Sequence, residues 1–216
     1  MGIALKTGLR EKTVMSGIGM DFAKTYLEGL KQSVEALPLN ALSRIASVIW
    51  ETYQKNRQIF VIGNGGSAAT AAHFACDLAK GTITEGKKRF RVIALTDSIP
   101  VITAWSNDFG YDRVFVEQLK NLLQPGDLVI GFSGSGNSKN VLFAMDYARA
   151  SSANTVGICG LGGGMMPGLA DECLIVDSTD MQQVEDIHLI ITHIMSRFLR
   201  LCVEQGFQGA GPQWKG

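Results

Sequence analysis

The chain has 216 residues, of which 46% are hydrophobic, and this length and composition suit one well-filled domain with a helical extension. Its 20 lysines and arginines balance its 20 aspartates and glutamates, so non-specific binding to nucleic acids or to a membrane surface is not expected. No apolar run approaches the ~20 residues that cross a bilayer, and the four cysteines are widely spaced, so we expect reduced thiols in a soluble, cytoplasmic protein.

The two ends of the chain are predicted to differ from its centre. Residues 1–20 are expected to form a weakly ordered N-terminus, and residues 206–216 a flexible tail. Residues 21–205 are expected to form a single domain that begins with a helical arm. Apolar side chains at three- and four-residue steps indicate helix from Asp21 to Lys55, and Pro38 divides it in two.

Five short apolar runs predict β-strands, at residues 58–62, 90–95, 127–132, 154–159 and 172–177. Helical patterns separate most of them, at residues 66–80, 98–122 with a break near 107–110, 137–151 and 182–205. This alternation predicts an α/β fold with a five-stranded parallel sheet flanked by helices. Five parallel strands favour the flavodoxin-like order 2-1-3-4-5, in which the first and third strands flank the ligand-binding crevice.

Two turns rich in glycine and serine follow those two strands. The first is GNGGS, Gly63 to Ser67, which includes Asn64 and Gly65, and the second is SGSGNS, Ser133 to Ser138, with Ser135 inside it. Each turn leads into a helix, so unpaired backbone N–H groups and serine hydroxyls are expected to meet at one place. Such turns favour an anionic, hydroxyl-rich ligand, most simply a sugar phosphate.

Neither turn has the spacing of a nucleotide-binding loop. The chain lacks the G-x-G-x-x-G and the following acidic residue of a dinucleotide site, and it lacks the G-x-x-x-x-G-K-[ST] of a nucleoside triphosphate site. No nucleotide cofactor is therefore expected. A purely structural role is the alternative for each turn, because glycine-rich turns are common and Asn137 or Ser138 could simply cap the next helix.

All three histidines lie on two predicted helices. His73 and Asp77 are four residues apart and share a helix face, whereas Glu185 and His193, eight residues apart on the last helix, lie near one face. His188 points to another side and is interpreted as structural. Two imidazoles and two carboxylates suit a divalent metal such as zinc, or general acid–base catalysis. The alternative for any one of them is a satisfied core group or a surface side chain.

The chain resembles the sugar isomerase (SIS) domain, and within it the phosphoheptose isomerase family, in four ordered segments: GNGGSAATAAHFACDLAKG, ALTD with SNDFGYDRVF, SGSGNSKNVLFAMDYAR and EDIHLIITHI. The resemblance extends from about Asp21 to Val203. It implies the SIS-domain fold and a homotetramer formed through the N-terminal and C-terminal helices. It also implies an aldose–ketose isomerase that acts through an enediol(ate) on sedoheptulose 7-phosphate or a related ketose phosphate.

The resemblance assigns roles to individual residues. Those expected to bind the substrate are Asn64, Gly65, Ser67, Asp97, Ser133, Ser135, Ser138 and Glu185. The positions of zinc and of catalysis are matched by His73, Asp77, Glu185 and His193. Among these, Asp77 is the candidate base and His193 the candidate acid.

The chain departs from the family at three positions. The family has Glu at the position of Asp77, Gln at that of Glu185, and usually Thr at that of Gly134. The shorter Asp77 reduces the reach of the carboxylate by about 1.5 Å, so a different sugar specificity is expected. The alternative function is a non-catalytic SIS module that binds a sugar phosphate or a protein partner, as in the replication-initiator-binding branch. Members of that branch lack the metal-binding residues, so the presence of these residues in this chain favours the enzyme.

Overall fold

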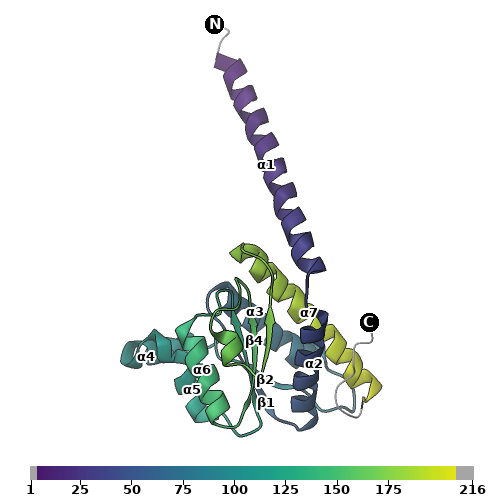
Figure 1. Ribbon diagram of the computed structural model, residues 1–216, viewed down its shortest axis with the longest axis vertical. Helices are drawn as coiled ribbons and strands as arrows, with labels where there is room; N and C mark the ends of the chain where they lie inside the picture. Colours follow the sequence, from purple (N-terminus) through teal and green to yellow (C-terminus); the bar gives the residue numbers. More distant parts are fainter. Residues whose placement is uncertain (1–3, 208–216) are drawn as a thin grey trace.

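A five-stranded, all-parallel sheet forms the centre of the molecule (Figure 1). The computed structural model describes the backbone of residues 4–207 and the side chains of residues 19–207. The strand order is β2-β1-β3-β4-β5, which confirms the flavodoxin-like order. The strands are β1 (Gln58–Ile62), β2 (Arg91–Ala94), β3 (Leu128–Ser133), β4 (Asn154–Cys159) and β5 (Glu172–Ile175).

Helices cover both faces of this sheet. One face carries α2 (Leu39–Gln54), α3 (Gly66–Cys76) and α7 (Met181–Gln205), and the other carries α5 (Val114–Leu122) and α6 (Lys139–Ala150). The helix α4 (Ile99–Phe109) lies at the margin of the molecule (Figure 1), and none of its side chains is buried. Short helical turns complete the chain, at Asp77–Gly81 (π-helical), Tyr111–Arg113 and Met166–Gly168 (both 3-10).

The first helix, α1 (Ala4–Glu35), extends away from the rest of the molecule (Figure 1). It begins well before Asp21, where the sequence analysis starts the helical arm, because residues 4–20 contain no proline and many good helix formers. The weak order expected for residues 1–20 stays a prediction. Of the tail predicted at 206–216, residues 208–216 lie outside the described part of the chain.

The three inner strands, β1, β3 and β4, are almost fully buried, as the centre of a sheet covered by two helical layers requires. In β1, Ile59 and Val61 pack into the cluster under α2, α3 and α7, whereas Phe60 and Ile62 pack into the cluster under α5 and α6. This division follows from the alternation of side chains along a strand. Within residues 4–207, no helix is both long and apolar enough to cross a membrane.

His188 is fully buried on the sheet side of α7, where its ring packs 5.8 Å from the ring of Phe132. Neither ring nitrogen makes a hydrogen bond to the part of the chain that the structure describes. Burial lowers the pKa of His188 to about 4; the nearby Cys159 backbone opposes this shift but does not reverse it. The ring is therefore neutral at pH 7 and acts as a core group.

We expect this histidine to make the protein less stable in mild acid. Between pH 6.5 and about 4 the unfolded chain binds a proton at His188 that the folded chain does not, so the free energy of unfolding falls as the pH falls. Between pH 7 and pH 5, His188 should lower the free energy of unfolding by about 2 kcal/mol, and the substitution His188→Leu should remove this decrease. Urea unfolding of both proteins at the two pH values measures this. Parallel losses in the two proteins would contradict it.

Candidate functional site

The two predicted turns meet at the carboxyl ends of β1 and β3. Asn64, in the first turn, exchanges two side-chain hydrogen bonds with Asn140, at the start of α6, with N–O distances of 2.8 and 2.9 Å. The Tyr111 hydroxyl donates to the Asn64 Oδ1 atom at 2.8 Å. Asn140 is only 2% exposed. Neither Asn140 nor Tyr111 is among the residues predicted to bind substrate, although both lie within the segments that resemble the family.

The second turn gathers hydroxyl groups at this edge of the sheet. The Ser133 and Ser138 hydroxyls lie 3.1 Å apart, and the Ser135 hydroxyl accepts a hydrogen bond from the Asn137 backbone N–H at 3.2 Å. Ser67 stands at the second position of α3, so its hydroxyl lies beside the unpaired N–H groups of that helix end. The arrangement suits an anion with several oxygen atoms.

The loop that follows β4, which has no predicted role, supports the second turn. The Gly136 carbonyl accepts hydrogen bonds from the backbone N–H groups of Met165 and Met166, each at 3.1 Å, and the Gly134 carbonyl accepts one from Gly160 at 3.1 Å. Gly136 has a φ of +63°, and a Cβ atom there would overlap the Gly163 carbonyl. Only glycine fits this contact, which fixes the serine hydroxyls in place.

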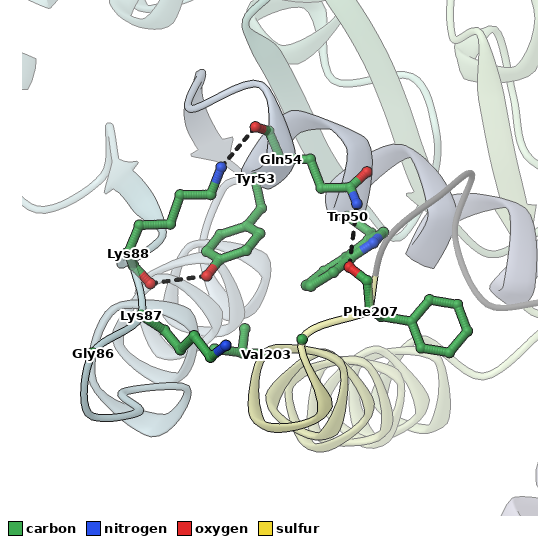
Figure 2. Close-up of a pocket in the computed structure, with 9 residues that line it drawn as sticks. Trp50, Tyr53, Gln54, Gly86, Lys87, Lys88, Val203 and Phe207 are labelled. Atoms are coloured by element: carbon green, nitrogen blue, oxygen red, sulfur yellow. Dashed lines mark hydrogen bonds between the residues drawn. The ribbon is translucent and has the colours of Figure 1, made fainter.

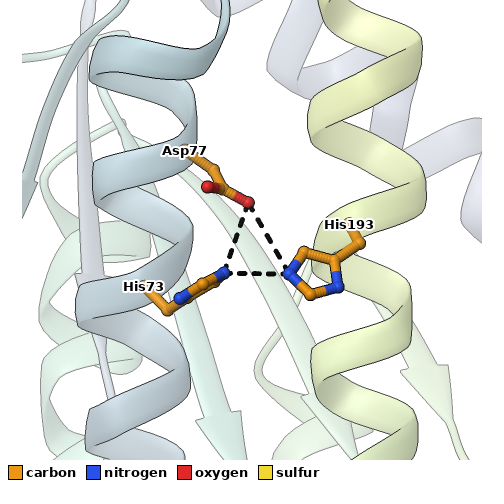
Figure 3. Close-up of side chains that lie close together, drawn as sticks. All are labelled: His73, Asp77 and His193. Carbon is orange, nitrogen blue, oxygen red and sulfur yellow. Dashed lines mark hydrogen bonds and ion pairs between the residues drawn. The ribbon is translucent and has the colours of Figure 1, made fainter.

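Three of the four predicted metal residues lie together between α3 and α7 (Figure 3). The His73 and His193 Nε2 atoms are 2.9 Å apart, and the Asp77 Oδ2 atom lies 3.5 Å from the first and 4.0 Å from the second. We call His73, Asp77 and His193 the triad. Its side chains are 47%, 29% and 49% exposed, respectively, so a ligand can reach them from solvent.

Two structural features hold the Asp77 carboxylate. The Ser196 hydroxyl, one turn after His193 on α7, donates to its Oδ2 atom at 3.4 Å. Asp77 is also where the α-helical hydrogen bonds of α3 give way to the π-helical turn. Such local widenings of a helix occur frequently at functional sites. The Asp77 Oδ2 atom makes the contacts with His73, His193 and Ser196, so the Oδ1 atom is left for a ligand.

Glu185, the fourth predicted metal residue, is not part of this group. Its carboxylate lies against Gly66, so closely that a Cβ atom at position 66 would overlap it. The eight residues between Glu185 and His193 span about 12 Å of helix, and this separation places the two side chains at different levels of α7. Glu185 therefore lies at the N-terminal end of α3, where a negative charge is favourable.

The other predicted residues lie around the same edge of the sheet. Gly65 precedes α3 with a φ of +54°. Asp97 is exposed in the turn after β2, with its Oδ1 atom 3.5 Å from the Thr96 hydroxyl. Gly134 leaves a space that Met181, the first residue of α7, fills with its thioether sulfur. A threonine at position 134 would require Met181 to move.

The triad offers two imidazoles and a carboxylate, a donor set that could hold a metal ion. Four tetrahedral ligands at 2.0–2.2 Å from zinc are about 3.3–3.6 Å from one another. The three distances of 2.9, 3.5 and 4.0 Å lie close to this range, so small side-chain movements would suffice. Three protein ligands also leave a fourth position open, as in catalytic zinc sites.

A cavity of about 610 Å³ lies elsewhere, between the ends of α2 and α7 (Figure 2), and it is larger than the cavity of about 350 Å³ that the triad lines. Its wall includes Tyr53, whose hydroxyl donates to the Lys88 carbonyl at 2.9 Å, and Lys88 Nζ donates to the Gln54 carbonyl at 2.6 Å. These residues lie near the amino ends of β1 and β2, away from both turns and from the triad. Size alone therefore does not identify the candidate site.

The fold and the two turns match a known class of protein. A family model described as the SIS domain matches residues 22–160. A solved structure of a phosphoheptose isomerase from Francisella tularensis has a TM-score of 0.77 and 26% identity, covering 83% of this chain and 96% of that one. Another, from Neisseria gonorrhoeae, has a TM-score of 0.76 and 27% identity, covering 89% and 99%.

The curated relatives are more similar in sequence. A phosphoheptose isomerase from Helicobacter pylori is 38% identical over 182 residues, which cover 84% of this chain and 92% of that protein. One from Aliarcobacter butzleri is 41% identical over 176 residues, covering 81% and 91%. The chain therefore belongs to the phosphoheptose isomerase family of SIS-domain proteins.

Proposed function

We propose that this chain interconverts the aldose and ketose forms of a phosphorylated sugar, sedoheptulose 7-phosphate or a related ketose phosphate. The observation that carries the proposal is the triad of titratable side chains. The triad lies toward the end of α3, and the serine-rich edge of the sheet lies at the start of the same helix. The serines at that edge hold the phosphate, and the triad faces the carbonyl carbons. The names of the relatives support the same class of substrate.

The spacing of the two parts fits a seven-carbon sugar. Ser67 and His73 are six residues apart on α3, which is about 9 Å along the helix axis. An extended chain of seven carbons with a terminal phosphate covers about 9–10 Å, because each C–C bond is about 1.5 Å long. A sugar phosphate anchored at the serines therefore brings its first two carbons to the triad.

Isomerisation requires that a proton leave the carbon beside the carbonyl and return to the neighbouring carbon. Asp77 is the base, because its Oδ1 atom faces away from the two imidazoles while Oδ2 is held by Ser196 (Figure 3). His193 donates a proton to the carbonyl oxygen as the enediol(ate) forms. His193 then takes the proton of the neighbouring hydroxyl while Asp77 delivers its proton to the other carbon, so the carbonyl group moves by one carbon and no external oxidant or reductant is needed.

His73, Asp77 and His193 would hold the divalent metal, which we take to be zinc. When bound there, zinc supplies a Lewis acid for the substrate oxygens. Glu185 lies at the helix end near the phosphate site, so we assign it a substrate-binding role. Asn64, Gly65 and Asp97, around the same edge, complete the binding residues.

The non-catalytic SIS module is the weaker candidate. A module that binds only a sugar phosphate needs the serine turn, but it does not need two imidazoles and a carboxylate within 4.0 Å of one another. Clustered titratable groups in an accessible cleft are typical of active sites. The four described cysteines are free, which fits the reducing cytoplasm that we propose as its location.

We further propose that the protein works as a homotetramer, with α1 as one contact surface. This helix extends from the body (Figure 1), and Phe22 and Leu27 on it are 72% and 61% exposed. Large apolar side chains at such exposure are costly in water and contribute about 1.5–3 kcal/mol each when covered. A second copy of the chain supplies that cover.

Isomerase activity is tested by solvent deuterium exchange. The wild-type protein with zinc supplied should introduce deuterium into one of a panel of phosphorylated ketoses, as mass spectrometry detects. We expect Asp77→Asn to abolish the exchange, because the amide does not accept the proton, while phosphate binding persists. Ser133→Ala with Ser138→Ala should instead raise KM. Absence of exchange in the wild-type protein for every ketose phosphate would refute the isomerase.

Metal binding is tested by elemental analysis. The purified protein should hold about one zinc ion per chain, and His73→Ala or His193→Ala should reduce this to near zero because two protein ligands hold zinc poorly. His188→Leu is the matched control, since its ring is buried in the core. Zinc content that is equal in all four proteins would show that the triad is not the site.

Assembly is tested by light scattering with size-exclusion chromatography. We expect four chains per particle in the wild type, and a smaller particle for Phe22→Asp with Leu27→Asp, because charges desolvated in a contact are unfavourable. Lys24→Asp, on the same helix, changes charge without removing an apolar group and serves as control. A monomeric wild-type protein would rule out this assembly.

A further inference from the structure

A second cavity, of about 350 Å³, opens directly beside the triad between α3 and α7. Its wall is completed by Gly81, Ser196, Arg197 and Arg200. A Cβ atom placed at Gly81 would meet nothing within 4 Å, so this end of the cavity is empty of protein. The three side chains of the triad form the rest of the wall.

Arg197 differs from its neighbour Arg200 in one respect. The Arg200 Nε atom is engaged by the Glu204 carboxylate at 2.8 Å. Across residues 19–207, no hydrogen bond or ion pair involves the Arg197 side chain, which is exposed. It follows His193 by four residues, so the two side chains are neighbours on one face of α7. A guanidinium without a partner thus faces the same space as the triad.

The charge of this cavity favours an anion. Among the described residues in its wall, Asp77 is the one carboxylate, and two arginines face it: Arg200, whose charge is paired with Glu204, and Arg197, whose charge is not. Arginine offers several N–H donors in a fixed plane and stays charged at any working pH. A developing oxyanion is the kind of group that such a donor stabilises.

The sugar's phosphate is not that anion. Met181, at the start of α7, packs on the serine turn at Gly134. Ser67, beside Gly66, lies level with Glu185, and Arg197 follows Glu185 by twelve residues of α7. His193 lies between them, eight residues after Glu185, so the serines and Arg197 lie on opposite sides of the triad along this helix. An anchored phosphate leaves only the carbonyl end of the substrate within reach of Arg197.

We propose that Arg197 is a further catalytic residue, which donates a hydrogen bond to the substrate oxygen that becomes negative in the enediolate; this inference rests on the proposed function. As Asp77 takes the proton, the C–H electrons form the carbon–carbon double bond and the carbonyl π electrons move onto oxygen. Arg197 stabilises that oxygen, without a change in its own protonation, until His193 gives the oxygen a proton. When His193 takes the proton of the neighbouring hydroxyl and Asp77 returns its proton to the other carbon, the carbonyl has moved and the contact with Arg197 weakens.

Two ligands separate this role from simple binding. The first is a phosphorylated aldonohydroxamate, which places a negative oxygen at the reacting end, and the second is the matching phosphorylated alditol, which has none. Calorimetry with Arg197→Ala should show about 100-fold weaker hydroxamate binding, the size expected for one oxyanion donor, and unchanged alditol binding. The value of kcat should fall by a similar factor with little change in KM. Arg197→Lys should restore part of both.

The control is Arg44→Ala. Arg44, on α2, carries an exposed guanidinium that pairs with Glu172, on β5, at 2.8 Å. Its removal should not change the affinity for either ligand. The proposal is overturned if Arg197→Ala keeps full hydroxamate affinity, loses both ligands equally, or changes the number of chains per particle. If the wild type isomerises no sugar phosphate, the proposed function fails by itself. The hydroxamate affinity then tests Arg197 separately. Weaker binding by Arg197→Ala than by the wild type supports an oxyanion site, and equal binding refutes it.

Discussion

The side-by-side packing of α3 and α7 is the interaction on which the site depends. At one level the Glu185 carboxylate lies against Gly66, and further along the same two helices His193 meets His73. Seven residues separate the α3 members and eight separate the α7 members, about 10.5 and 12 Å of helix. The helices therefore run in the same direction and nearly in register. Gly66 makes this possible because a side chain there would collide with Glu185.

The elements that hold these helices could be predicted from the sequence because their signals are local. The run QIFVI is apolar at every position after Gln58, and only a strand covered on both faces needs such a run. Gly110, with a φ of +86°, ends α4 within the predicted break of the 98–122 segment. The strand order could also be predicted, since few arrangements of five parallel strands place both polar turns at one crevice.

The finer composition of the site could not be predicted, because it depends on contacts between distant residues. A helical wheel places Glu185 and His193 near one face of α7, but only the packing of α7 beside α3 shows that His193, and not Glu185, meets His73 and Asp77. Asn140 looks like an ordinary helix residue until its amide pairs with Asn64, 76 positions earlier. Arg197 resembles any charged residue of a solvated helix; it lines the cavity together with Arg200, and it differs from Arg200 because that side chain is paired with Glu204.

The π-helical turn at Asp77–Gly81 sets the rotational phase of the chain that follows it. Such a turn holds one more residue than the α-helical turn that it replaces. Each residue of an α-helix advances the chain by about 100°. Relatives that lack the extra residue would therefore direct the segment after Asp77 toward a different neighbour, even with every side chain of the triad in place. The length of this turn, as much as the identity of its residues, determines which side chains lie at the Gly81 end of the cavity and leaves that end open in this chain.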